Sequence, residues 1–182
     1  MELKGKKVLV CGMAKSGISA AKLLVKLGAL VTLQDIKIKE DVKEFEELGI
    51  ELYMGKNPDD IVKNFDLVVL SPGVPFDLPF VGIAKENNIK VIGDVELCFW
   101  FTKCMVYGIT GTNGKTTTTA LTGEIFKTQF KNVKVLGNIG NPYGDEVLNL
   151  EKDDAAVIEL SSFQLETIET FKPHISACLN IT

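Results

Sequence analysis

Two rhythms of apolar and polar positions alternate along the chain. Short runs rich in Val, Ile and Leu are followed by longer segments in which apolar positions recur at helical spacing. A clear case is the apolar run 7–11 (KVLVC), which a glycine turn joins to a helix-like segment at 16–28. Buried parallel strands read as continuous apolar runs, with amphipathic helices crossing between them. The pattern therefore predicts βαβ units around a parallel sheet.

The same rhythm continues to the end of the chain. Further strands are predicted at 30–35, 51–54, 66–71, 90–93, 104–110, 132–136, 155–160 and 174–182. Further helices are predicted at 40–48, 79–88, 94–103, 115–128, 142–149 and 161–170. The first set of units closes at Gly93, and a fresh strand follows the connecting helix. We therefore expect one domain over 1–93 and a second, incomplete domain over 94–182.

Composition and charge narrow the class of protein. The 182 residues are 46% hydrophobic and 24% charged, which supplies a core and excludes disordered and low-complexity chains. The net charge of -4 lacks the basic excess that draws proteins to nucleic acid or anionic lipid. The four cysteines show no CxxC spacing and the chain has one histidine, so no zinc site is expected. Without a signal-peptide-like or membrane-spanning run, we expect a cytoplasmic protein with no membrane insertion.

The strongest chemical signal is the sequence GITGTNGKTT at 108–117, between a predicted strand and a predicted helix. Gly111 and Gly114 would let backbone amides turn inward, and the helix N-terminus adds partial positive charge. Lys115 would reach the phosphates of a nucleotide, and the Thr116 hydroxyl would meet Mg²⁺. The first glycine of the usual phosphate-loop spacing is displaced by one residue. The alternative is a chance Gly-Lys-Thr turn that caps a helix.

An acidic residue, Glu159, ends the apolar run 155–160. The carboxyl end of a buried parallel strand faces the crevice where ligands of open α/β sheets bind. Glu159 could therefore hold a metal ion opposite Thr116. Alternatively, it could cap the helix that starts at Ser161 and Ser162. The phosphate loop upstream favours metal binding.

The first βα turn carries a weaker nucleotide signal. Gly12 follows the first strand, Ala14 stands where a dinucleotide fingerprint has its middle glycine, and Asp35 ends the second strand. This pattern favours nucleotide binding of some kind but not NAD; the alternative is a turn selected for packing alone.

Ser71 begins the sequence SPG after a strand, where either a binding loop or a plain turn is possible. Asn138 could donate to a ligand or adopt a left-handed turn.

Taken together, these segments resemble a known family. GITGTNGKTTT (108–118), GNIG (137–140) and ELSSFQLE (159–166) are similar to the ATP-dependent Mur ligases of peptidoglycan synthesis, and SSFQLE looks most like the D-glutamate-adding branch. The displaced glycine is this family's own variant. The resemblance implies an α/β fold: a Rossmann-like parallel-sheet domain that binds UDP-N-acetylmuramoyl-L-alanine, then an incomplete P-loop-type domain that binds ATP and Mg²⁺. D-glutamate would join the substrate through an acyl phosphate.

The resemblance also implies residue roles. Lys115 and Glu159 would be catalytic, and Thr116 and Glu159 would hold Mg²⁺. ATP would contact the phosphate loop, namely Gly111, Thr112, Asn113, Gly114, Lys115, Thr116 and Thr117. The sugar nucleotide would contact Gly12, Lys15, Ser16, Asp35, Ser71, Gly73, Asn138 and Ser161.

Two alternatives stay open. One is a non-catalytic module that binds a UDP-muramoyl peptide or another nucleotide, and the other is a Mur ligase that adds a different amino acid. The family continues past LNIT, so we expect this chain alone not to turn over. A monomer is expected for the full-length enzyme, although the sequence leaves the oligomeric state of this chain open.

Overall fold

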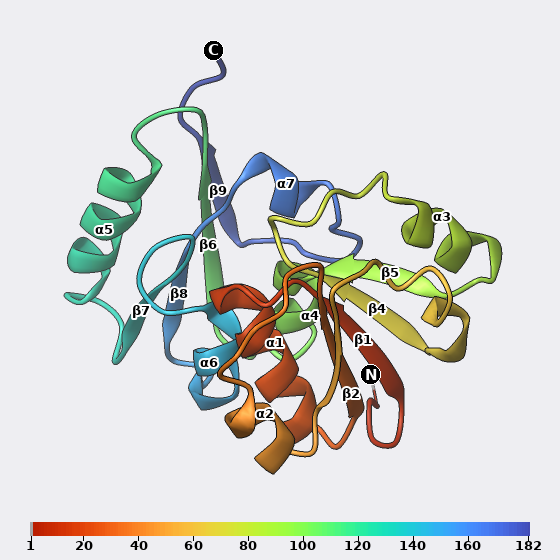
Figure 1. Cartoon of the computed structure of the whole chain (residues 1–182). Coiled ribbons are helices and arrows are strands. Elements are labelled where there is room, and N and C mark those ends of the chain that lie inside the picture. Colours follow the sequence, from red (N-terminus) through yellow and green to blue (C-terminus); the bar gives the residue numbers. More distant parts are fainter. Residues whose placement is uncertain (1) are drawn as a thin grey trace.

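The computed structural model describes residues 2–182, which form two parallel sheets side by side (Figure 1). The first sheet has the order β3-β2-β1-β4-β5, and all its neighbours are parallel. Its strands are β1 (Lys7–Cys11), β2 (Leu30–Asp35), β3 (Glu51–Met54), β4 (Leu67–Leu70) and β5 (Lys90–Gly93). The order changes direction at β1, where β2 lies on one side and β4 on the other. In such sheets the crevice at the carboxyl ends of the strands is the usual ligand site.

The second sheet has the order β7-β8-β6-β9 and is also parallel. Its strands are β6 (Met105–Thr110), β7 (Val133–Gly137), β8 (Ala155–Glu159) and β9 (Ile175–Cys178). All of β8 is buried, whereas β9 is exposed along its whole length. β8 is therefore a central strand of this sheet, and β9 an edge.

Helices connect the strands in chain order. They are α1 (Lys15–Lys26), α2 (Lys43–Glu47), α3 (Pro79–Glu86), α4 (Asp94–Phe99), α5 (Lys115–Phe126), α6 (Tyr143–Glu146) and α7 (Ser162–Leu165). Two short 3₁₀ helices, η1 (Val62–Asn64) and η2 (Val147–Asn149), complete the set of described elements. No helix within residues 2–182 is long and apolar enough to cross a membrane.

The predicted parallel α/β fold is confirmed, and the strands fall into two sheets on either side of Gly93. Whether the domain boundary lies at Gly93 stays a prediction. Several elements are shorter than predicted, two of them by five residues or more. The helix predicted at 161–170 is only α7, and the strand predicted at 174–182 is only β9. In both cases distant residues bind the remaining segment. The Glu96 carboxylate accepts hydrogen bonds from backbone amides after α7, and the loop after β6 is hydrogen-bonded to Asn180.

The two sheets share one apolar core. The core contains Leu24 from α1, Leu97 from α4, Tyr143 from α6 and Ile158 from β8, all buried. Helices α1 and α6 contact each other directly (Figure 1), and a Cβ added at Gly144 would come within 2.7 Å of the Ser19 hydroxyl. The absence of a side chain at Gly144 therefore allows the first unit to pack tightly against the second.

Helix α4 joins the two sheets through Glu96, whose side chain is fully buried. Its carboxylate accepts hydrogen bonds from the backbone N–H groups of Glu169, Thr170 and Phe171 at 2.8–3.0 Å. The Thr170 hydroxyl and the Trp100 indole N–H also donate to it, at 2.5 and 2.8 Å. A buried carboxylate is tolerated only when its oxygens are satisfied in this way. We call this group of contacts the Glu96 clamp.

We predict that Glu96→Gln lowers the free energy of unfolding by about 2–4 kcal/mol, because the amide NH₂ would face N–H donors and leave them buried without an acceptor. Urea denaturation measures the change. The matched control is Glu47→Gln on α2, where an exposed carboxylate lies 3.8 Å from Lys43. That substitution should change stability by less than about 0.5 kcal/mol. Equal effects of the two substitutions would contradict the clamp.

The Glu96 clamp also makes the free energy of unfolding depend on pH. Burial alone would raise the pKa of Glu96, but the hydrogen bonds from Thr170, Glu169 and Phe171 outweigh burial and lower the pKa. A lowered carboxyl pKa contributes stability above the unfolded-state value of about 4.3, and the contribution is lost as pH falls through the folded-state pKa. The stability difference between wild type and Glu96→Gln should therefore shrink as the pH falls below about 5. A constant difference down to pH 3 would argue against it.

Candidate functional site

A cavity of about 590 Å³ lies at the carboxyl edge of the first sheet. Four of the residues predicted to bind substrate line it together, namely Gly12, Asp35, Ser71 and Gly73. The Asp35 carboxylate accepts the backbone N–H groups of Met13 and Lys37, both at 2.8 Å. Asp35 thus fixes the loops after β1 and β2, and the cavity is preformed by backbone contacts.

The wall of this cavity depends on Gly17, in the first turn of α1. A Cβ there would overlap the carbonyl oxygen of Gly12 and the hydroxyl of Ser71. The Ser71 hydroxyl donates to that same carbonyl at 3.0 Å. Helix α1 can therefore approach β4 closely only because residue 17 has no side chain. No side chain caps α1, so its first-turn amides remain directed toward this edge of the sheet.

Lys15 and Ser16, also predicted to bind substrate, do not line the 590 Å³ cavity. Both lie in the first turn of α1, where Lys15 is exposed and Ser16 is half-buried. The Ser16 side chain is instead among the groups that lower the pKa of Asp94. Ser16 therefore faces the junction between the two sheets.

The predicted phosphate loop connects β6 to α5. Gly114 is the residue before α5 and has a φ of 82°, a left-handed conformation that favours glycine. Lys115 bends back over the loop, and its ammonium donates to the carbonyl oxygens of Gly111 at 2.6 Å and Thr112 at 3.1 Å. The amides of Lys115, Thr116 and Thr117 are in the first helical turn, where no intrahelical acceptor exists. One ammonium and one helix N-terminus thus lie together above this loop.

Asn180, which the sequence did not single out, braces the loop. Its side-chain oxygen accepts from the Asn113 N–H at 2.8 Å, and its side-chain NH₂ donates to the Asn113 carbonyl at 3.0 Å. Its own carbonyl accepts from the Thr112 N–H at 2.9 Å. The amides of Thr112 and Asn113 are therefore engaged within the protein, and those of the helix turn are the ones directed outward.

Glu159 lies at the same edge of the second sheet. The strand register pairs it with Ile109, two residues before the loop, and with Gly137 at the end of β7. The residue is 5% exposed, and its Oε2 atom is buried with no hydrogen-bond partner in residues 2–182. The capping role considered above does not occur, since Ser161 caps α7. An unsatisfied buried carboxylate oxygen beside a phosphate-type loop is a donor suited to a cation.

Asn138 is exposed next to Glu159, and its N–H donates to the Glu159 carbonyl at 3.2 Å. The left-handed conformations in this turn belong to Gly137 and Gly140, at φ values of 99° and 68°. The left-handed turn considered for Asn138 is therefore wrong.

The donor set is typical of Mg²⁺. Among residues 2–182, no three His, Cys, Asp or Glu side chains gather to form an all-protein metal site. Mg²⁺ is usually bound by one or two carboxylates together with waters and substrate phosphates. The single buried carboxylate of Glu159 fits that pattern.

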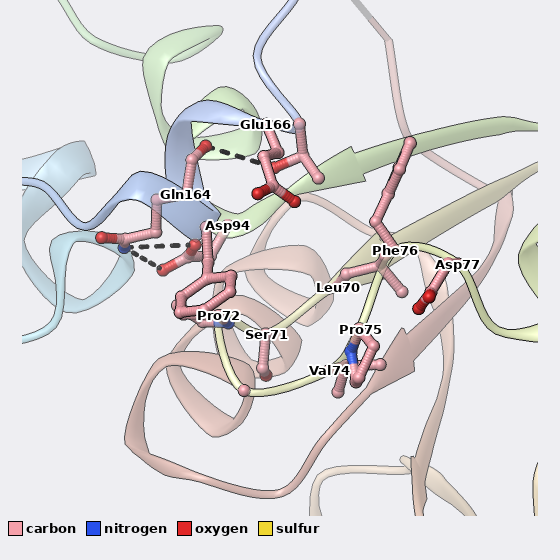
Figure 2. Close-up of a pocket in the computed structure, with 13 residues that line it drawn as sticks. Leu70, Ser71, Pro72, Val74, Pro75, Phe76, Asp77, Asp94, Gln164 and Glu166 are labelled. Carbon is pink, nitrogen blue, oxygen red and sulfur yellow. Dashed lines mark hydrogen bonds between the residues drawn. The ribbon is translucent and has the colours of Figure 1, made fainter.

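A second cavity, of about 540 Å³, lies between the loop after β4 and the segment around α7 (Figure 2). Ser71, Asp94, Phe163 and Gln164 are among its lining residues. Burial raises the pKa of Asp94 to about 6, against the lowering effect of hydrogen bonds that include one from Gln164. Such a carboxyl contributes stability that is present below its unfolded pKa of about 3.9 and lost as pH rises through about 6. The ionised form of Asp94 at this junction therefore lowers the stability of the folded chain.

Comparison with known proteins gives a consistent result. The sequence model for the N-terminal domain of MurD-like Mur ligases matches residues 6–93, and that for the Mur ligase middle domain matches residues 109–182. Over the whole chain, 50% of residues are identical to the UDP-N-acetylmuramoylalanine–D-glutamate ligase of Thermoanaerobacter sp. (strain X514), and 49% to that of Clostridioides difficile (strain 630). The chain spans 41% and 42% of these relatives, respectively.

Solved structures show the same fold. The UDP-N-acetylmuramate:L-alanyl-gamma-D-glutamyl-meso-diaminopimelate ligase of Neisseria meningitides aligns with a TM-score of 0.60 at 18% identity, covering 98% of this chain and 61% of that one. The UDP-N-acetylmuramate-alanine ligase MurC of Thermotoga maritima aligns with a TM-score of 0.56 at 23% identity, covering 97% and 41%.

We predict that Gly17→Ala destabilises the chain by about 2–3 kcal/mol, because the new methyl group overlaps backbone that cannot move without opening the first βα turn. Thermal unfolding measures this change. Gly82→Ala in α3 is the matched control, since nothing lies within 4 Å of a Cβ there. The control should leave stability unchanged or raise it by up to about 1 kcal/mol. If Gly17→Ala were as stable as this control, the close approach of α1 would be disproved.

We predict that Asn180→Ala loosens the phosphate loop, because both side-chain bonds to Asn113 are lost. The protection of the Asn113 amide against hydrogen exchange should fall by about tenfold or more. Asn87→Ala is a suitable control: it removes an exposed asparagine that bonds Ile83 in α3, far from the loop. It should leave Asn113 unchanged, and unaltered protection in Asn180→Ala would rule out the brace.

Proposed function

The chain belongs to the Mur ligase family, and on that premise we propose that it is the substrate-binding and nucleotide-binding part of a ligase that adds D-glutamate to UDP-N-acetylmuramoyl-L-alanine. The observation that carries the proposal is the buried, unpartnered Oε2 of Glu159 at the same sheet edge as the Lys115 loop. A phosphate site that works without a bound cation would not need this carboxylate. Relatives named as that ligase, at about half identity over the whole chain, support the choice of amino acid.

Each half of the chain would bind one substrate. In the first half, the cavity with Gly12, Asp35, Ser71 and Gly73 would take the UDP group. Its backbone amides and the uncapped N-terminus of α1 suit a diphosphate. Asn138 and Ser161 in the second half would face the muramoyl group, and Lys15 and Ser16 would lie between the two.

In the second half, Lys115 and the first-turn amides of α5 would bind the ATP phosphates. The Lys115 ammonium would exchange the loop carbonyls for phosphate oxygens without leaving the loop. The Thr116 hydroxyl and Glu159 would hold Mg²⁺, which when bound supplies neutralisation of the phosphate charge. Residues 111–117 and Glu159 would thereby bring two anions, the γ-phosphate and the alanyl carboxylate, close together.

The chemistry of such a ligase explains these requirements. A carboxylate resists attack by an amine because its leaving group would be oxide. Transfer of the γ-phosphoryl group from ATP to the alanyl carboxylate gives ADP and an acyl phosphate. The D-glutamate amine then attacks the acyl carbon, and the C–O bond to phosphate breaks as the amide forms. Positioned positive groups are the main catalytic contribution in phosphoryl transfer.

We predict that Lys115→Ala weakens binding of a nonhydrolysable ATP analogue with Mg²⁺ by tenfold or more, on the order of one lost charge-assisted contact. The same substitution should leave the affinity for UDP-N-acetylmuramoyl-L-alanine unchanged, because that ligand is bound by the other cavity. Isothermal titration calorimetry with each ligand measures both effects. Glu159→Gln should reduce the gain in analogue affinity that Mg²⁺ provides.

The matched control is Lys127→Ala, which removes an exposed lysine directly after the same helix, paired with Glu124. It should change neither affinity. Wild-type protein that binds neither ligand, or that binds the ATP analogue equally well with and without Lys115, would refute the proposed function.

A further inference from the structure

Asp94 and Gln164 form a buried link between the two sheets. Asp94 begins α4, directly after β5, and is 7% exposed; Gln164 lies in α7 and is 2% exposed. The Gln164 side-chain NH₂ lies 3.4 Å from each Asp94 carboxylate oxygen. Dashed lines mark both contacts in Figure 2. At Gly93, next to Asp94, an added Cβ would overlap the Thr167 hydroxyl. The two segments are therefore in direct contact, with no room for a side chain between them.

The link continues to Ser161. The side-chain oxygen of Gln164 accepts from the Ser161 N–H at 3.0 Å and from the Ser161 hydroxyl at 3.2 Å. The Ser161 hydroxyl in turn accepts from the Gln164 N–H at 3.3 Å. An ionised carboxylate can only accept, so Asp94 requires the NH₂ end of the Gln164 amide to face it. The oxygen end must then face Ser161. Asp94 and the Ser161 N–H thus favour the same orientation of the Gln164 amide.

Ser16, in the first unit, is the next residue to consider beside Asp94. Its side chain, in the first turn of α1, is among the groups that lower the pKa of the same Asp94 carboxylate. Asp94 therefore lies between Ser16 in the first unit and Ser161 in the second, two of the three serines proposed above to contact the sugar nucleotide. The capping of α7 alone does not require this connection, because a capping box needs only residues 161 and 164.

We propose that Asp94 is a positioning residue that acts through Gln164 to hold the Ser161 hydroxyl and amide in place for the muramoyl part of the substrate. The proposal rests on the proposed function for its ligand, but the geometry of the link does not. Under this proposal, a residue at the carboxyl end of the first sheet affects ligand binding at the second sheet.

Gln164→Glu tests the link while keeping the cap. A glutamate at this position still accepts from the Ser161 N–H, as in a Ser-x-x-Glu capping box. It cannot donate to Asp94 and places a second carboxylate against it. We expect affinity for UDP-N-acetylmuramoyl-L-alanine to fall by about tenfold with affinity for UDP alone unchanged. The Ser161 amide should also exchange its hydrogen faster than in wild type. Gln129→Glu, the same change at an exposed site after α5, should alter none of these values.

The decisive variant reverses the polarity of the link. In the double variant Asp94→Asn with Gln164→Glu, the asparagine NH₂ donates to the new carboxylate, so the contact is restored with donor and acceptor exchanged. We expect sugar-nucleotide affinity and Ser161 protection to return to within about threefold of wild type. A double variant no better than Gln164→Glu alone would overturn the proposal. So would an equal loss of affinity for UDP and for the sugar nucleotide, which marks a general structural role.

The two proposals fail separately. If wild-type protein does not bind UDP-N-acetylmuramoyl-L-alanine, the proposed function falls, while Ser161 exchange in the single and double variants still decides the link. If wild type binds the ligand but the single variant changes neither affinity nor exchange, the positioning role falls and the function stands. Thermal unfolding of each variant confirms that a folded protein is being compared.

Discussion

The Glu96 clamp is the interaction on which the arrangement of the two halves depends. Its carboxylate lies in the shared core and gathers donors from the backbone at 169–171, more than seventy residues away. Because a buried carboxylate that lacks hydrogen-bond donors costs several kcal/mol, the segment after α7 has one favourable position. That position sets α7 against α4 and brings Gln164 beside Asp94. The contact between Asp94 and Gln164 is thus supported by hydrogen bonds made several residues further along the chain.

The two halves use the same βα rhythm to build different anion sites. In the first, the turn after β1 is closed tightly by Gly17 and Ser71, and Asp35 ties it to the neighbouring loop. In the second, the loop after β6 is wider and carries a lysine above it, braced from outside by Asn180. Under the proposed function, the first would bind the sugar nucleotide and the second the triphosphate of ATP.

Much of this fold was predictable from sequence because buried parallel strands have a strong local signal. The runs that became β1, β2, β3 and β5 were located to the residue. The phosphate loop and Glu159 were found by spacing and strand position. Residues whose role depends on a distant partner were not. The helix predicted at 161–170 ends early because Glu96 binds its amides, and neither Asn180 nor the Asp94–Gln164 pair has a local pattern. The site roles themselves stay predictions.

The tight contact of α1 with α6 has a consequence for the energetics of ligand capture. Since Gly144 leaves no slack against Ser19, and a common core lies under both sheets, parting the halves would expose buried apolar surface. A ligand that contacted both halves would find them already packed together, so little of its binding free energy would be needed to bring them into contact.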